Sequence, residues 1–101
     1  MKPSRYWLSF DLGFRGNYED LYLWLDHHEA KECGEGVATF LSSDSRESLI
    51  EELSLLFGSD KKARLYLIDR QNGGRFILGN RKPPQWAGAA PREVEADEEP
   101  L

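Results

Sequence analysis

The stretch that decides the fold is RYWLSFDL, residues 5–12. Side chains alternate between the two faces of a β-strand, and one set here is aromatic and aliphatic: Tyr6, Leu8, Phe10 and Leu12. The other set ends in a carboxylate: Trp7, Ser9 and Asp11. Asp11 therefore need not enter the core, and three interpretations of it stay open. It could hold a metal ion, meet a partner subunit or shape the turn into Gly13.

Two helices are predicted downstream of this strand. Asn17 can cap the first helix, whose apolar stripe repeats at helical spacing: Tyr18, Leu21, Tyr22 and Leu25. Asp44 and Glu47 form a capping box at the start of the second helix, and Gly58 stands where a left-handed C-terminal cap is expected. The stripe of the second helix is also apolar: Leu49, Ile50, Leu53, Leu56 and Phe57.

Further strands are predicted on either side of the second helix. VATFLSS at residues 37–43 and ARLYLIDR at residues 63–70 are rich in strand-forming side chains. Residues 31–33 can add a short strand that pairs with residues 37–43 through the Gly-Glu-Gly bend. Asn72-Gly73 favours a type I′ hairpin turn, after which residues 75–80 return as a last strand.

This order of elements predicts an α+β protein. We expect a two-layer α/β sandwich, ferredoxin-like βαββαβ with an extra C-terminal strand, in which both helices cover one face of the sheet. Residues 1–86 would form this single domain, and residues 87–101 read as a disordered acidic tail. The other face of the sheet carries Trp7, a large group to leave in water, so we expect a homodimer.

Charge is unevenly distributed along the chain, although its total is only −5. Residues 1–60 hold five basic and 12 acidic side chains, and residues 61–92 hold eight basic and one acidic. Residues 93–101 add five acidic side chains and no basic one. A basic segment can attract phosphate in an acidic protein, because screening confines such fields to about 8 Å at physiological salt.

Nothing in the sequence predicts a membrane protein. The longest apolar run is Leu21–Leu25, which is far too short to cross a bilayer. No apolar segment of signal-peptide length follows the N-terminal charges. Cys33 is the single cysteine, so no disulfide can form within the chain, and we expect a cytoplasmic protein.

Three motifs give the chain a family resemblance. They are a first strand that ends in an acid (SFDL), a strand RLYLI after a short helix, and the run GGRFILGNRKPP. Over residues 5–86 the chain resembles the small ferredoxin-fold subunit of the CRISPR spacer-acquisition machinery, a family of dimeric, nuclease-like proteins.

The resemblance implies a catalytic role for the acid that ends the first strand. That acid is Asp11 here, and in a dimer it would face its symmetry mate and share a divalent metal, Mg²⁺ or Mn²⁺. Such a metal prefers carboxylate oxygens and can activate water against a phosphodiester. Ser9, on the same strand face, would lie near it. Whether the protein is an enzyme stays open at this point.

The best candidates for binding RNA or DNA are cations in the basic segment: Lys61, Lys62, Arg64, Arg70, Arg75, Arg81 and Lys82. They alternate with Tyr66, Phe76 and Trp86, and exposed aromatic rings can stack on bases. In the alternative interpretation the aromatic side chains belong to the core and the cations guard strand edges against aggregation.

A second class of function is compatible with the same fold. The chain could be a non-catalytic protein-binding module, such as an antitoxin or a regulatory partner. Pro83-Pro84-Gln85-Trp86 would then be a segment that docks on another protein, because a preformed extended backbone loses little entropy on binding.

Overall fold

The computed structural model describes residues 2–80. Its elements, in chain order, are β1 (Ser4–Asp11), α1 (Tyr18–His27), β2 (Lys31–Gly34), β3 (Val37–Ser42), α2 (Arg46–Phe57), β4 (Arg64–Asp69) and β5 (Gly73–Leu78). The predicted acidic tail at residues 87–101 lies outside the described residues, as do Arg81, Lys82 and Trp86.

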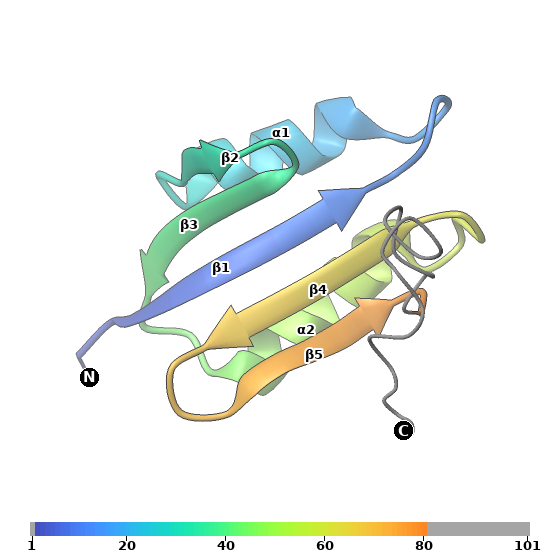
Figure 1. The fold of residues 1–101 in the computed structure, drawn as a ribbon. Helices are drawn as coiled ribbons and strands as arrows, with labels where there is room; N and C mark the ends of the chain where they lie inside the picture. Colours follow the sequence, from blue (N-terminus) through green and yellow to red (C-terminus); the bar gives the residue numbers. More distant parts are fainter. Residues whose placement is uncertain (1, 81–101) are drawn as a thin grey trace, which may run out of the picture.

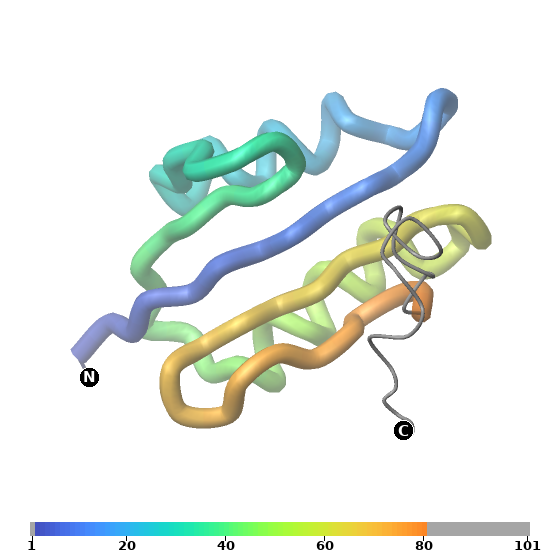
Figure 2. Tube along the Cα trace, in the orientation of Figure 1, coloured from blue at the N-terminus to red at the C-terminus, as the bar shows by residue number. Residues whose placement is uncertain are grey.

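The strands form one five-stranded sheet in the order β2-β3-β1-β4-β5 (Figure 1, Figure 2). Every neighbouring pair is antiparallel, and β1 lies in the centre between β3 and β4. A sheet of this kind with two helices confirms the predicted α+β class. The short strand predicted at residues 31–33 is confirmed as β2, and β5 pairs with β4 of the same chain.

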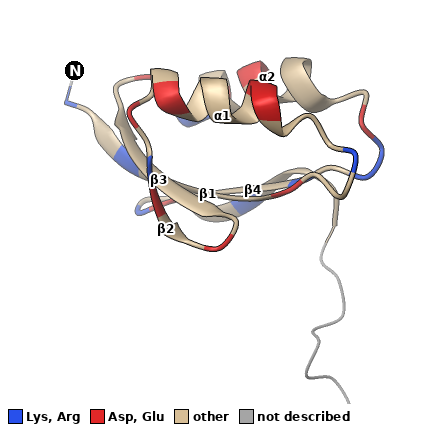
Figure 3. Ribbon diagram, turned by 90° about the horizontal axis from the view of Figure 1, so that it is seen from above, with Lys and Arg blue, Asp and Glu red and all other residues tan. Residues whose placement is uncertain are grey.

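The core lies between the sheet and the two helices, which are seen on the same side of it in Figure 3. Side chains of residues 5–12 alternate as the sequence predicts, since Tyr6, Leu8 and Leu12 are buried and Phe10 is partly buried against the same core. Trp7 and Ser9 are only partly buried and Asp11 is exposed. The central strand therefore divides the sheet into a packed face and an open one.

Helix α1 begins as predicted but faces the sheet with a different stripe. The Oδ1 atom of Asn17 accepts the N–H of Asp20 at 3.1 Å, which confirms the N-cap. Tyr22 is exposed, and Trp24 is buried in its place between Leu21 and Leu25. The ring of Trp24 can fill this position because it packs edge-on against Phe40, with centroids 5.3 Å apart.

Helix α2 is capped one residue later than the sequence predicts. The prediction that Asp44 caps this helix was wrong. Ser45 is the N-cap, and its hydroxyl accepts the N–H of Ser48 at 3.1 Å. Asp44 is held in the preceding loop, where its carbonyl oxygen accepts the hydroxyl of Tyr6 at 3.1 Å. A hydrogen bond from a buried tyrosine thus sets where the helix can begin.

Two further details of α2 differ from prediction. Gly58 is right-handed at φ −65°, so it supplies no left-handed cap. Leu56 is exposed, and the residues of α2 that are buried lie along a narrower stripe: Leu49, Leu53 and Phe57. A leucine turned to solvent on a packed helix is available for another contact.

The β4–β5 hairpin is wider than the predicted type I′ turn. Its loop spans residues 70–72, and only Gly73 adopts positive φ, at 72°, whereas a type I′ turn needs it at both central residues. The carboxylate of Asp69 causes this shape by accepting the main-chain N–H of Asn72 at 2.6 Å and its side-chain amide at 3.3 Å. Strand β5 consequently begins at Gly73.

Asp69 is a buried acid on which the hairpin depends. Burial by itself would raise the pKa of its carboxyl group, but the hydrogen bonds from Asn72 and the charge of Arg46 outweigh it and lower the pKa. The Nε atom of Arg46 lies 3.8 Å from Oδ2 of Asp69. The pKa of Asp69 is therefore lower in the folded protein than in the unfolded chain. The ionised carboxylate stabilises the fold fully above the unfolded pKa, and this contribution to the free energy of unfolding is lost as the pH falls through the folded pKa.

We expect Asp69→Asn to lower the free energy of unfolding by about 1–2 kcal/mol at neutral pH, because Arg46 loses its buried anion and Asn72 a charged acceptor. The gap between wild type and variant should narrow as the pH falls from about 7 to about 3, since a protonated Asp69 resembles the amide. Urea unfolding at both pH values measures this. Glu51→Gln, at an exposed site on α2, is the control. A gap that stays constant with pH would contradict the assignment.

Within residues 2–80 no helix combines the length and apolar character needed to span a membrane.

Candidate nucleic-acid interface

Asp11 ends β1 in a tight turn. Its Oδ1 atom accepts the main-chain N–H of Gly13 at 3.0 Å, and Gly13 has φ 76°. Its Oδ2 atom lies 3.9 Å from Nη1 of Arg64, the first residue of β4. Of the three interpretations left open by the sequence, the turn into Gly13 is therefore present. Contact with a metal or with a partner subunit stays a prediction.

Ser9 lies on the same open face as Asp11, one row further into the sheet. Its neighbours in the register are Val37 on β3 and Tyr66 on β4. In residues 2–80 no three His, Cys, Asp or Glu side chains come close enough together to hold a metal ion. A metal at Asp11 would thus draw its other ligands from water or from a second copy of the chain.

The end of the sheet that carries Asp11 gathers basic side chains. Lys61 and Lys62 stand exposed in the loop before β4, and Asp60 fixes that loop by accepting the N–H of Lys62 at 3.0 Å. Arg64 follows, and its Nε–H donates to the carbonyl of Asn80 at 3.3 Å. Three of the predicted cations are therefore brought together at this end.

Sequence reasoning missed two residues of this site, Phe14 and Arg15. Both belong to the loop between β1 and α1, and Phe14 is fully exposed. They share a shallow pocket of about 320 Å³ with Lys62 and Asp60 from the other loop. The signal in the sequence was an aromatic and a cation enclosed by glycines in GFRG, outside any periodic stripe. We call Phe14, Arg15, Lys61, Lys62 and Arg64 the basic end.

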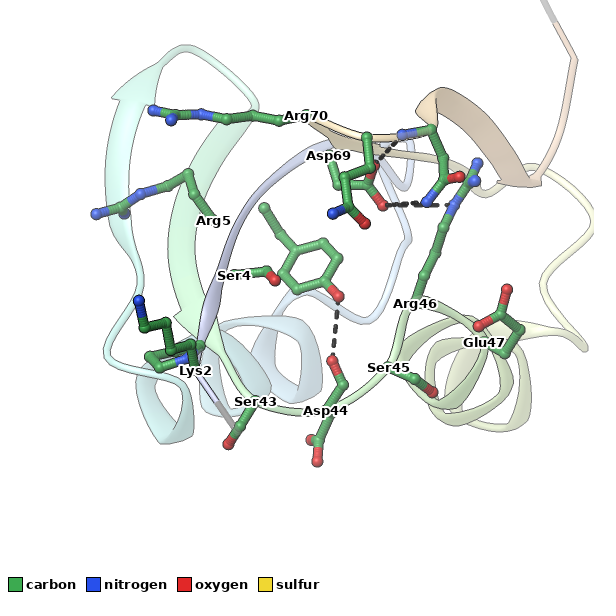
Figure 4. A pocket seen from close by; sticks show the side chains of 14 residues that line it. Lys2, Ser4, Arg5, Ser43, Asp44, Ser45, Arg46, Glu47, Asp69 and Arg70 are labelled. Atoms are coloured by element: carbon green, nitrogen blue, oxygen red, sulfur yellow. Dashed lines mark hydrogen bonds and ion pairs between the residues drawn. The ribbon is translucent and has the colours of Figure 1, made fainter.

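Arg70 and Arg75 do not join the basic end. Arg70 follows the last residue of β4, about 20 Å along the strand from Arg64 at roughly 3.3 Å per residue. Figure 4 shows its side chain, with that of Arg5, projecting away from Asp69. Arg75 pairs with the buried Leu67, which puts it on the helix-covered face at the edge strand. The predicted cations therefore form no single patch.

Charge separates between the basic end and the helices. Acidic side chains on α1 and α2 account for the red segments of the upper layer in Figure 3: Glu19, Asp20, Asp26, Glu47, Glu51 and Glu52. Arg15, Lys61 and Lys62 lie in the two loops at the basic end instead. A phosphate approaching the helix layer would be repelled, so the loops at the basic end offer the better approach.

The open sheet face is apolar at its centre. Its centre consists of side chains that share rows across four strands: Trp7, Ser9, Val37, Thr39, Leu41, Tyr66, Ile68 and Phe76. Charged side chains lie on the same face toward its two ends and its edge: Arg5, Asp11, Lys31 and Arg64. Tyr66 and Phe76 pack edge-on with centroids 4.7 Å apart. Tyr66 and Phe76 are only partly buried and lie outside the core, whose side chains, such as Leu65 and Leu67, point to the other face. The assignment of Trp86 to the core concerns a residue outside the described part of the chain, and the role of the cations in guarding strand edges stays a prediction.

The chain matches no protein-family model, no curated protein and no solved structure.

Proposed function

We propose that the chain is a homodimeric, ferredoxin-like protein that binds single-stranded RNA or DNA at its basic end. The resemblance of SFDL, RLYLI and GGRFILGNRKPP to the CRISPR-associated family supports this class of function. The ferredoxin-like assignment is supported by the antiparallel order β2-β3-β1-β4, in which each helix connects two strands separated by one other. Strand β5 is then the addition to that plan.

The observation that carries the proposal is the exposed ring of Phe14 beside cations. An aromatic side chain that is fully exposed contributes nothing to the core, and a base can stack on it. Arg15 and Lys62 line the same pocket as Phe14, so they are placed to meet the phosphates on either side of that base. Stacking on a ring requires an unpaired base, which favours single strands.

The dimer is proposed through the open sheet face. The apolar side chains at its centre lie in neighbouring rows, and a cluster of this kind often marks a contact with another protein. The charged side chains around it, such as Arg5 and Lys31, would form the rim of the contact. A two-fold axis would bury this face against the same face of a second copy. Four residues of the basic end lie in loops beyond the strands and would stay outside the contact: Phe14, Arg15, Lys61 and Lys62. Arg64, the first residue of β4, lies beside Asp11 at the end of the open sheet face.

Fluorescence anisotropy with short labelled single-stranded RNA and DNA tests the function. We expect binding whose affinity falls between about 50 and 200 mM salt, with a slope of about −3 for four phosphate contacts at 0.7 each. A wild-type protein that is a dimer but binds neither RNA nor DNA would instead favour the alternative function, a non-catalytic protein-binding module. Binding that does not depend on salt would also contradict the basic end as the site.

Metal-dependent nuclease activity at Asp11 is a second candidate, favoured by one observation. The carboxylate is half-exposed at the end of β1, beside the face proposed to meet a second copy. Two such carboxylates from a dimer could share Mg²⁺ or Mn²⁺ with water, and Ser9 would lie near them. The cation of Arg64, 3.9 Å away, would compete with the metal for the same oxygen.

We expect Asp11→Asn to abolish any Mg²⁺- or Mn²⁺-dependent cleavage while leaving the fold intact. The amide oxygen of asparagine can still accept the N–H of Gly13, so the substitution removes the charge and retains the turn. Gel assays of labelled RNA and DNA measure cleavage, with thermal unfolding as the control. If the wild-type protein cleaves neither RNA nor DNA with either metal, the nuclease hypothesis is rejected. The proposal that the basic end binds nucleic acid is not affected by that result.

A further inference from the structure

Leucine side chains stand out from the layer of helices. Leu23 on α1 is 53% exposed, and Leu55 and Leu56 on α2 are 81% and 45% exposed. The buried stripes of both helices are already filled by other residues, so these leucines have no role in the described core. Exposed apolar side chains on two adjacent helices form a surface rather than isolated sites, and such surfaces mark interactions.

The leucines line a groove between α1 and α2. It has a volume of about 580 Å³ and is lined by Asp20, Leu23, Trp24, His27, His28, Glu52, Leu55 and Leu56. Its floor is fixed, because the indole N–H of the buried Trp24 donates to Oε1 of Glu52 at 2.6 Å and so joins the two helices. The ring of His28 stacks on Trp24 with centroids 3.9 Å apart. A preformed groove loses little entropy when it is occupied.

The rim of the groove is acidic. Its two charged lining side chains are Asp20 and Glu52. Four further carboxylates lie on the same helices outside the groove lining and add to the negative field there: Glu19, Asp26, Glu47 and Glu51. Arg46 is the single Lys or Arg of the two helices, and it faces Asp69. Figure 3 shows the acidic segments on both helices. Phosphate is therefore repelled here, and a cationic partner is attracted.

We propose that this groove binds a basic amphipathic helix of another protein. Leucine-like side chains of that helix at spacings of three and four fill the groove over Trp24, and its flanking Lys and Arg side chains face the rim. The groove matches such a ligand in size, because helices of 10 and 12 residues are about 15 and 18 Å long and three turns of a bound helix cover about 16 Å. The site is separate from the basic end.

A synthetic peptide of about 16 residues, with leucines at helical spacing and lysines elsewhere, tests the proposal on the full chain. Anisotropy of the labelled peptide gives its affinity. We expect Leu55→Ser and Leu23→Ser each to lower that affinity about tenfold, because each removes apolar contact area from the groove. Tyr22→Ser is the control, since Tyr22 is 55% exposed on α1 but does not line the groove, and we expect it to change the affinity less than about twofold. A peptide of the same composition with its leucines scattered should bind about tenfold more weakly.

Several outcomes would overturn the proposal. Equal affinities for the ordered and scattered peptides would reduce the binding to charge attraction. Equal losses of affinity with Tyr22→Ser and Leu55→Ser would show that the peptide does not bind in the groove. If Leu55→Ser made a self-associating protein monomeric, the groove would be a contact between copies. A peptide of residues 81–92 that bound the groove more tightly than the synthetic helix would make the chain's own basic segment the occupant.

Discussion

Reversing the charge of Arg15, Lys61 and Lys62 to glutamate is expected to lower the affinity for single-stranded nucleic acid about a hundredfold. Loss of three phosphate contacts at roughly 1 kcal/mol each corresponds to a factor of about 100 or more. All three side chains are exposed, and the hydrogen bond that fixes their loop uses the main-chain N–H of Lys62. The fold should therefore survive. The salt slope should fall by about 2, at 0.7 for each contact removed.

The control is a second triple reversal with the same change in net charge. Lys2, Arg70 and Arg75 are also exposed, but they lie before β1, at the hairpin and on β5, away from the basic end. We expect their reversal to weaken binding by less than about fivefold, through the general field alone. Equal losses in the two variants would show that net charge rather than the basic end determines affinity. The measurement is anisotropy with the same oligonucleotides for both proteins.

The local elements could be predicted from the sequence because each depends on few residues. Alternation in residues 5–12 separates the packed face of β1 from its open face, and the structure has the same two sets. Which side of each helix is buried was harder to predict. Tyr22 and Trp24 are both large and aromatic, and the packing of Trp24 on Phe40 from β3 decides which is buried. Likewise Ser45 caps α2 because Tyr6, distant in sequence, holds Asp44.

The candidate site could be predicted only in part, because its geometry depends on strand register. Asp11 meets Arg64 because β1 and β4 pair in antiparallel register, a contact between residues far apart in the chain. The same strand direction carries Arg70 to the opposite end of β4. The cations of the basic segment are therefore close in sequence but do not all lie close together in space. Phe14 could not be identified as a site residue from the sequence, because its exposure depends on the loop conformation.

Trp7→Glu is expected to raise the dissociation constant of the dimer about a hundredfold. Trp7 is in the central strand of the open sheet face, opposite Thr39 and Ile68, so a symmetric contact through this face would bury it. A glutamate there loses the apolar contact and leaves a carboxylate buried without a partner, facing the same charge on the second copy. The core should not change, because Trp7 lies on the face opposite to it.

Sedimentation velocity at protein concentrations up to about 100 µM measures the dissociation constant of the dimer for the wild type and for Trp7→Glu. Leu23→Glu is the matched control, an apolar side chain replaced by the same acid on the helix layer, and it should leave the dimer intact. A wild-type monomer throughout this range, or a dimer unaffected by Trp7→Glu, would reject the open sheet face as the contact. A dimer lost with Leu23→Glu alone would move the contact to the helices.

The Trp7→Glu monomer also separates the two parts of the proposed function. It keeps Phe14 and the cations of the basic end, so it should still bind a short oligonucleotide that reaches one site. A longer strand that spans both subunits of the dimer gains from effective concentration, and the monomer loses that gain, which is at least about tenfold for linked sites. Equal loss for short and long strands would mean that the second copy completes each site. In that case Asp11, beside the open sheet face, would be the residue that both copies bring to it.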